Sequence, residues 1–194
     1  MAVGASRAEA CAGAPIACAQ ADLCARARRQ SEKRRVTEAA PAAISLAPGN
    51  SRDLDSVIEV MNCAFDDRFG EAWTRSQCAG ILPLPGVRLM LARLADESTV
   101  GFSLIRTVSD EAELLLIAVA PPCRRRGVGR KLLDDFIDHA LQSGATRLHL
   151  EVREGNPAIA MYRSAGFSTA GRRRKYYRGR GGGEFDALTL ARQL

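Results

Sequence analysis

The sequence predicts a single mixed α/β domain (α+β mixed sheet), and three observations lead to this prediction. The chain has 194 residues, of which 46% are hydrophobic and 26% charged, an ordinary balance for one globular domain with a packed core. Apolar residues repeat at helical spacing in some segments and alternate in others, which predicts the order α-α-β-β-β-α-β-α-β-β. This order contains a strand-helix-strand crossover, the unit that joins parallel strands. We therefore expect a mixed sheet with helices packed on it.

Residues 1–42 are rich in Ala and Arg, and we expect them to form a disordered tail. The first 40 residues contain thirteen alanines but only five bulky apolar residues, too few to offset the entropy of ordering the segment. A marginal helix, a targeting segment and a start codon assigned too far upstream are alternative interpretations. The folded domain is expected to span residues 43–194.

Two helices and three strands are expected in the first half of this domain. Apolar residues repeat at helical spacing from Leu54 to Phe65, behind the candidate N-cap Asp53. A shorter helix is expected over residues 74–82, because Pro83 disfavours helical geometry in the residue before it. The three strand-like runs are Val87–Leu94, Val100–Val108 and Glu113–Ala120. Their links are short, which predicts an antiparallel meander.

The second half predicts a helix, a strand, a second helix and two further strands. The first helix begins near Val128 and ends at Gly144, a candidate C′ glycine. The strand over residues 147–152 alternates, so Glu151 points to the face opposite its leucines. The last elements are a helix from Asn156 to Ala165 with Pro157 in its first turn, and strands at Phe167–Tyr177 and Phe185–Ala191.

Composition and cysteine spacing argue against membrane and metal-binding classes. The longest strongly apolar stretch, residues 114–120, is far shorter than the roughly 20 residues that a spanning helix needs. The six cysteines form no C-x-x-C pair, and the two histidines lie apart from them. We expect no metal, no membrane partner, reduced thiols and a cytoplasmic location.

A basic loop that contains glycine leads into the helix near Val128. We expect backbone N–H groups of residues 124–129 to converge at the start of this helix, where partial positive charge would stabilise a pyrophosphate. The loop matches neither a Walker loop nor a dinucleotide fingerprint, because Leu132 stands where those motifs need Ser or Thr and Gly or Ala, respectively. A solvated loop that only caps the helix is the alternative.

The sequence resembles the GNAT family of acetyl-CoA-dependent N-acetyltransferases in two segments, IAVAPPCRRRGVGRKLL from Ile117 and LHLEVREGNPAIAMYRSAGF from Leu148. The likeness covers about residues 44–194, with three motifs in order at matching separations. It implies the GNAT acyl-CoA N-acyltransferase fold, with acetyl-CoA as co-substrate. The coenzyme-binding residues that it implies are Ile117, Ala118, Val119, Arg124, Arg125, Arg126, Gly127, Val128, Gly129, Arg130 and Asn156.

The resemblance also assigns a role to a strand backbone. In this family the strand that matches Ile117–Val119 is bulged and diverges from its neighbour, so that its backbone can bind the pantetheine arm. The N–H of Val119 would then polarise the thioester carbonyl, a form of oxyanion stabilisation. The side chains of Ile117 and Val119 are expected to be ordinary strand core.

Two residues match the family's proton-transfer groups. The attacking α-amine has a pKa of about 7.7–8.0 and must be neutral to react. Glu151 matches the general base, and Tyr162 matches the acid that protonates the departing thiolate. From the residues alone, Glu151 is equally consistent with a surface carboxylate and Tyr162 with a core side chain.

The likeness is greatest to members that acetylate the N-terminal alanine of ribosomal proteins, in the runs EAELLLIAVAP, LEVR, MYRSAGF and RRRKYY. It implies direct transfer of acetyl to the N-terminal α-amine of a protein, specifically the N-terminal alanine of a small-subunit ribosomal protein. Acetylation of a small amine, and a basic module that binds RNA or ribosomes without catalysis, are the alternatives.

One spacing departs from the family pattern. The family commonly places an Asn seven residues before the matching Tyr, whereas Asn156 precedes Tyr162 by six. Asn156 therefore has two interpretations, a contact to the pantetheine arm or a cap of the following helix.

Two segments match the walls of the family's peptide groove. The resemblance implies substrate contacts from Phe69 and Trp73 in the loop 65–73, and from Tyr176 and Tyr177 in the terminal hairpin. Core filling is the alternative for Phe69 and Trp73. The acidic residues of the loop would suit a basic peptide.

The formal net charge of +6 is unevenly distributed. Residues 124–131 hold five basic side chains and residues 172–180 hold six, with no acids in either segment, so the rest of the chain carries a net charge of −5. The segment 172–180 interleaves basic residues with tyrosines, as some RNA-binding strands do. Because the GNAT resemblance implies that it borders the peptide groove, we do not expect direct nucleic-acid binding.

Overall fold

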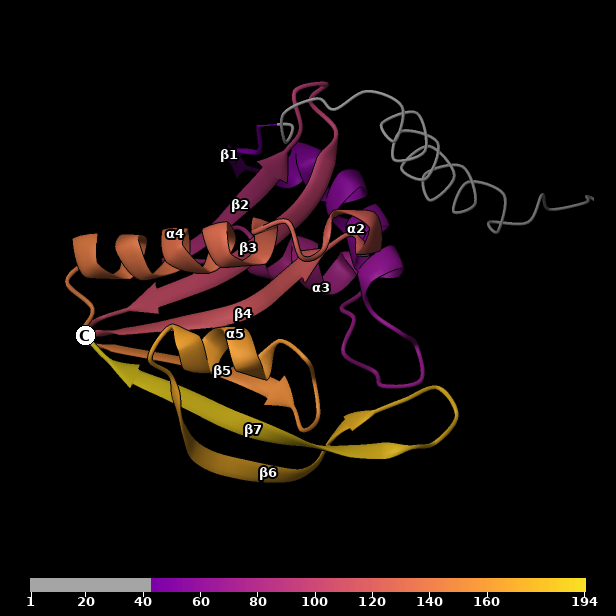
Figure 1. Cartoon of the computed structure of the whole chain (residues 1–194), viewed down its shortest axis with the longest axis vertical. Helices are drawn as coiled ribbons and strands as arrows, with labels where there is room; N and C mark the ends of the chain where they lie inside the picture. Colours follow the sequence, from indigo (N-terminus) through magenta and orange to yellow (C-terminus); the bar gives the residue numbers. More distant parts are fainter. Residues whose placement is uncertain (1–42) are drawn as a thin grey trace, which may run out of the picture.

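The computed structural model describes residues 43–194, and the tail predicted for residues 1–42 lies outside them. One seven-stranded sheet, in the order β1-β2-β3-β4-β5-β7-β6, organises the domain (Figure 1). The strands are β1 (Ser45–Gly49), β2 (Val87–Arg93), β3 (Thr99–Val108), β4 (Glu111–Val119), β5 (Arg147–Arg153), β6 (Ser168–Arg178) and β7 (Glu184–Gln193). The α-helices are α2 (Leu54–Ala64), α3 (Arg75–Ile81), α4 (Val128–Gln142) and α5 (Ile159–Ser164).

The predicted elements are all present in the predicted order, and β1 is an addition to it. β1 pairs antiparallel with β2 at the edge of the sheet. β1 was not predicted, because its five residues include Pro48 and Gly49 and carry no strand pattern. Proline is tolerated there because an edge strand leaves one side of its backbone unpaired. The helix predicted from Asn156 is also shorter, beginning at Ile159.

Helices cover both faces of the sheet, because successive side chains of β2 pack alternately against α2 on one face and α4 on the other. Leu89 and Leu91 belong to the core cluster that contains α2, whereas Met90 and Ala92 pack with α4. α5 lies on the same face as α4, since Tyr162 of α5 and Phe136 of α4 belong to one further core cluster. Among the described residues, no helix is long and apolar enough to cross a membrane.

The central strands β4 and β5 pair only over half their length. Their parallel ladder begins at Glu111 and ends at Leu114, which lies opposite Leu150. Just beyond this point Leu115 is an extra residue in the ladder between β4 and β3, a β-bulge that redirects the strand. The crossover, the meander and the divergence implied by the GNAT resemblance are therefore present. The divergence opens the sheet at the carboxyl ends of two adjacent strands.

The terminal hairpin of β6 and β7 reaches toward the loop 65–74 that follows α2 (Figure 1). Three residues of β6 between Arg173 and Tyr177 stand opposite the single residue Asp186, a large bulge. The N–H of Lys175 donates to the Asp186 carboxylate at 2.8 Å and stabilises the bulge. The hairpin thereby bends toward the open end of the β4–β5 pair.

Candidate active site

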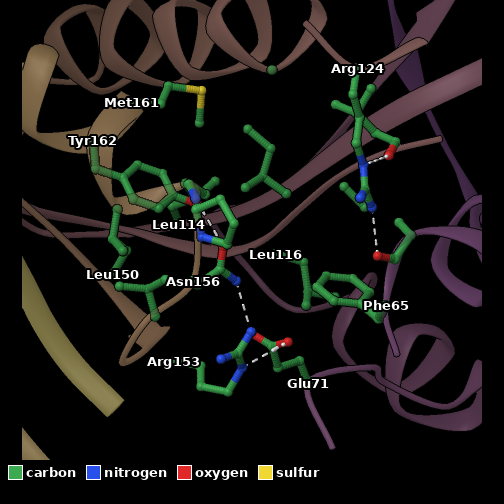
Figure 2. A pocket seen from close by; sticks show the side chains of 18 of the residues that line it. Phe65, Glu71, Leu114, Leu116, Arg124, Leu150, Arg153, Asn156, Met161 and Tyr162 are labelled. Carbon is green, nitrogen blue, oxygen red and sulfur yellow. Dashed lines mark hydrogen bonds and ion pairs between the residues drawn. The ribbon is translucent and has the colours of Figure 1, made fainter. Parts of the chain in front are cut away.

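A cleft of about 680 Å³ occupies the space where β4 and β5 diverge. This volume lies within the range of about 300–1,000 Å³ typical of small-molecule sites. β4 and β5 form its walls, with the N-terminus of α4, α5 and the loop 65–74 around them (Figure 2). The cleft therefore collects residues from both halves of the domain.

The backbone of β4 presents polar groups to this cleft. Ala120 donates its N–H to the carbonyl of Val100 at 2.8 Å, which makes these two residues a hydrogen-bonded pair between β4 and β3. Hydrogen-bonded and non-hydrogen-bonded pairs alternate in an antiparallel ladder. Val119 lies opposite Gly101 in a non-hydrogen-bonded pair. Ile117, two residues earlier, also occupies a non-hydrogen-bonded position of the ladder. The N–H and C=O groups of Val119 and Ile117 thus face away from β3 and toward the cleft.

The loop before α4 has the geometry of an anion cradle. Gly127 has φ +82°, a conformation that favours glycine, and a Cβ there would meet no atom within 4 Å. Arg125, Gly129 and Arg130 line the cleft beside it. Open space, positive charge and the first-turn N–H groups, which have no intrahelical partners at the start of this 15-residue helix, suit a pyrophosphate. These residues fit the phosphate portion of coenzyme A.

In the part of the chain that the structure describes, Arg124 donates hydrogen bonds to two backbone carbonyl groups, unlike the neighbouring arginines of the loop. Its Nε donates to the carbonyl of Val119 at 3.1 Å, and its Nη2 donates to the carbonyl of Ala64 at 2.6 Å (Figure 2). The guanidinium thus joins the end of β4 to the end of α2 and orients the Val119 peptide. Arg126 and Val128 do not line the cleft, because Val128 is buried in the core and Arg126 interacts with the Cys123 thiol.

Glu151 lines the cleft from β5. Its Oε1 accepts a hydrogen bond from Thr189 at 2.9 Å and lies 3.5 Å from Arg173 Nη1. Within residues 43–194, its Oε2 has no hydrogen-bond partner and is shielded from water. An unpaired buried carboxylate oxygen is costly, and a donor brought by a substrate would offset that cost.

Tyr162 lines the cleft from α5 and is 4% exposed. Its ring packs edge-to-face on Phe167 with the centroids 6.2 Å apart. Burial, and secondarily the negative charge of Glu71, raise the pKa of the Tyr162 hydroxyl. The hydroxyl is therefore held in its protonated form and can donate a proton.

A polar network connects the loop 65–74 to β5 and α5. Glu71 accepts a hydrogen bond from Asn156 Nδ2 at 2.9 Å and lies 3.2 Å from Arg153 Nε (Figure 2). Asn156 Oδ1 in turn accepts the N–H of Ala158 at 2.9 Å. Asn156 lines the cleft while it caps the turn before α5 and holds Glu71. At this shorter spacing to Tyr162, the Asn156 side chain therefore both caps the turn and binds Glu71.

The predicted peptide-groove residues are divided between the cleft and its surroundings. Phe69 and Tyr177 line the cleft, and Trp73 and Tyr176 do not. Trp73 packs against the core cluster of α2, and its backbone N–H donates to the sulfur of Met61 at 3.0 Å. Tyr176 is 44% exposed and packs edge-to-face on Tyr177.

The acidic side chains of the loop 65–74 are engaged in ion pairs, and the expectation that they suit a basic peptide stays a prediction. Asp66 pairs with Arg68 at 2.7 Å, Asp67 pairs with Arg180 at 2.9 Å, and Glu71 pairs with Arg153. These pairs fold the loop and attach it to the terminal hairpin.

Arg153 was not predicted as a site residue, and the contacts of Glu71 with Arg153 and Asn156 were not predicted either. For Arg153 a signal was present, since it follows Glu151 by two positions in a strand and so shares its face. For Glu71 no pattern indicated a partner 85 residues further along the chain.

Comparison with known proteins agrees with this geometry. The model of the acetyltransferase (GNAT) family matches residues 54–167, more than half of the chain. A ribosomal protein bS18-alanine N-acetyltransferase from Salmonella typhimurium is 45% identical over 104 residues, which cover 53% of this chain and 70% of that protein. The Escherichia coli relative of the same description is 46% identical over 92 residues, 47% of this chain and 62% of its own length.

The crystal structure of the Escherichia coli ribosomal-protein-S18-alanine N-acetyltransferase superposes with a TM-score of 0.69 at 30% identity. The match covers 78% of this chain and 94% of that structure. The chain therefore belongs to the GNAT family of acetyltransferases.

Proposed function

We propose that this protein transfers an acetyl group from acetyl-CoA to the N-terminal α-amine of a protein, specifically the N-terminal alanine of a small-subunit ribosomal protein. The observation that carries the proposal is the position of Glu151 and Tyr162 on one cleft beside the outward-facing backbone of Val119. The names of the Salmonella and Escherichia coli relatives support the choice of acceptor.

Acetyl-CoA supplies the acetyl thioester that the amine attacks. Glu151 accepts the proton of the substrate amine, and Oε2 is its only carboxylate oxygen without a protein partner among the described residues. Removal of this proton is needed because an α-amine is largely protonated below a pH of about 7.7.

The other two groups act on the thioester. The N–H of Val119 donates to the carbonyl oxygen as negative charge develops there, and the bond from Arg124 to the Val119 carbonyl orients this strand end. The new N–C bond forms while the C–S bond breaks. The Tyr162 hydroxyl then gives its proton to the sulfur, so the transfer needs no covalent enzyme intermediate.

Ion pairing weighs against the rival interpretation of segment 172–180 as an RNA-binding surface. Four of its six basic side chains are paired with carboxylates: Arg172 with Glu154 and Asp186, Arg173 with Glu151, Lys175 with Glu184, and Arg180 with Asp67. Cations neutralised in this way have less charge to offer to phosphates. The rival requires RNA affinity that falls steeply with salt, and no acetyl transfer.

The proposal is tested by incubating the protein with acetyl-CoA and short peptides that differ only in their first residue. We expect a mass gain of one acetyl group on peptides that begin with Ala, and none on the same peptides with a blocked N-terminus. Acetylation of a polyamine or aminoglycoside without any peptide product would refute the proposal.

The role of Glu151 is tested separately with Glu151→Gln. The substitution keeps the size of the side chain and removes its basicity, so we expect kcat to fall by about 10²-fold or more. Acetyl-CoA binding, measured by calorimetry, should stay near the wild-type value because Glu151 lies on β5, away from the loop before α4. Unchanged turnover would remove Glu151 from the mechanism.

A further inference from the structure

The side chain of Glu151 is held by a residue on the neighbouring strand. Glu151 and Thr189 lie directly opposite each other in the antiparallel pair of β5 and β7. Opposed residues in such a pair project from the same face of the sheet. The Thr189 hydroxyl donates to Oε1 of Glu151 at 2.9 Å, a normal distance for a hydrogen bond to a carboxylate.

The polar contacts of the Glu151 carboxylate are confined to one of its two oxygens. Arg173 Nη1 also approaches Oε1, at 3.5 Å. Oε2 has no hydrogen-bond partner among the described residues and is shielded from water. The carboxylate is therefore asymmetric, with one oxygen held by two partners and one that has none among the described residues.

Of the two partners, Thr189 is the better constrained. Arg173 has a side chain that is 57% exposed, and its guanidinium also lies 4.7 Å from the Tyr176 ring centroid. Thr189 is partly buried and β-branched, so its χ1 angle is restricted and its hydroxyl is held by the strand. Its hydrogen bond is also 0.6 Å shorter, from the distances of 2.9 and 3.5 Å.

We propose that Thr189 is a positioning residue that holds Oε1 and so fixes the orientation in which the Glu151 carboxylate accepts the substrate proton. This inference rests on the proposed role of Glu151. Thr189 does not touch the reacting atoms itself; it acts by fixing the rotation of the carboxylate. A carboxylate free to rotate would spend part of its time with neither oxygen aimed at the amine.

The test compares Thr189→Val, which removes the hydroxyl at constant shape, with Thr189→Ser, which keeps the hydroxyl. For Thr189→Val we expect kcat to fall about tenfold, a fraction of the effect of losing the base altogether. KM for acetyl-CoA and the melting temperature should stay near wild type. Thr189→Ser should restore most of the wild-type kcat.

A double variant shows whether Thr189 acts through Glu151. In a Glu151→Gln background, Thr189→Val should cause no further loss, because residues that act as a unit are not additive. The inference is overturned if Thr189→Val keeps wild-type kcat, if Thr189→Ser loses as much as Thr189→Val, or if the loss lies in KM for acetyl-CoA or in melting temperature.

The same experiments separate this inference from the proposed function. If the wild type acetylates no peptide, or if Glu151→Gln is fully active, the proposed function or its base is wrong and the inference falls with it. If Glu151→Gln is inactive while Thr189→Val is unaffected, the base assignment stands and only the role of Thr189 is refuted.

Discussion

The guanidinium carbon of Arg153 lies 3.7 Å from the ring centroid of Phe69, while Nε of the same side chain lies 3.2 Å from a carboxylate oxygen of Glu71. One arginine of β5 therefore holds two residues of the loop 65–74. Phe69 in turn packs edge-to-face on Phe185 of β7, with the centroids 5.1 Å apart. This chain of contacts closes the wall of the cleft on the side opposite α4.

Breaking the ion pair between Glu71 and Arg153 should destabilise this wall of the cleft. The side chains of Arg153 and Glu71 are only 12% and 9% exposed, so Glu71→Gln leaves a buried cation without its partner. We expect the free energy of unfolding to fall by about 3 kcal/mol in urea titrations. The double variant Glu71→Gln/Arg153→Met removes the unpaired charge and should recover part of the loss. A single variant as stable as wild type would contradict this account.

The contact between the loop and the hairpin depends on a glycine. A Cβ at Gly179 would lie 1.9 Å from the carbonyl oxygen of Arg68, so Gly179→Ala must push the two segments apart. We expect a higher KM for the peptide and a lower melting temperature. Gly181→Ala is the matched control, since a Cβ there would meet no atom within 4 Å. Equal behaviour of the two variants would show that the wall does not shape the peptide site.

Tyr162 should act as an acid that does not ionise in the assay range. Because burial raises the pKa of its hydroxyl, Tyr162 stays protonated as the pH rises through about 10, the ordinary tyrosine value. Tyr162→Phe should therefore lower kcat by about 10²-fold at every pH tested, with acetyl-CoA binding retained. A defect that appears only on one side of the pH–rate profile would speak against this role.

The two histidines should affect stability in opposite directions as the pH changes. His149 Nε2 lies 3.8 Å from a carboxylate oxygen of Glu113, and the interaction with Glu113 raises the His149 pKa. The folded state then holds its proton more tightly, so this stabilisation is complete below the unfolded pKa of about 6.5 and is lost as the pH rises through the raised value. Burial lowers the pKa of His139, so the folded state binds this proton less tightly than the unfolded state does. The free energy of unfolding therefore falls as the pH drops through the unfolded pKa.

Urea midpoints of His149→Gln and His139→Gln, measured at about pH 5.5 and pH 8, check these signs. Relative to wild type, His149→Gln should lose more stability at the acid pH than at the alkaline pH. His139→Gln should gain relative stability at the acid pH. Parallel curves for the two variants would refute both assignments.

The regular elements were predictable because each has a local pattern. The apolar spacing of α4 and the alternation of β5 depend on neighbours only a few residues away. β1 was not predictable, since Ser45–Gly49 becomes a strand only when β2 offers it a partner. Tertiary pairing, and not propensity, decides such a short edge strand.

Motifs in the sequence predicted which residue types form the candidate site. They did not predict the contacts that these residues make. Glu151 and Tyr162 could be matched to a known pattern, whereas the partners of Glu151 could not. Thr189 is 38 residues from Glu151 in sequence and reaches it only through the register of β5 and β7. The use of Arg124 as a bridge to Ala64 depends likewise on where α2 ends, 60 residues earlier.

The early end of the β4–β5 ladder at Leu114 has one more consequence. An unpaired strand edge on a protein surface invites other chains to add to the sheet, and proteins usually blunt or cover it. Here the edge lies inside the molecule, between α4 and the wall formed by the loop 65–74 and the terminal hairpin. The outward-facing N–H groups of Ile117 and Val119 line the cleft, where an extended ligand could pair with them. The fold thus places the kind of strand edge that elsewhere promotes aggregation where its free backbone groups can bind a ligand.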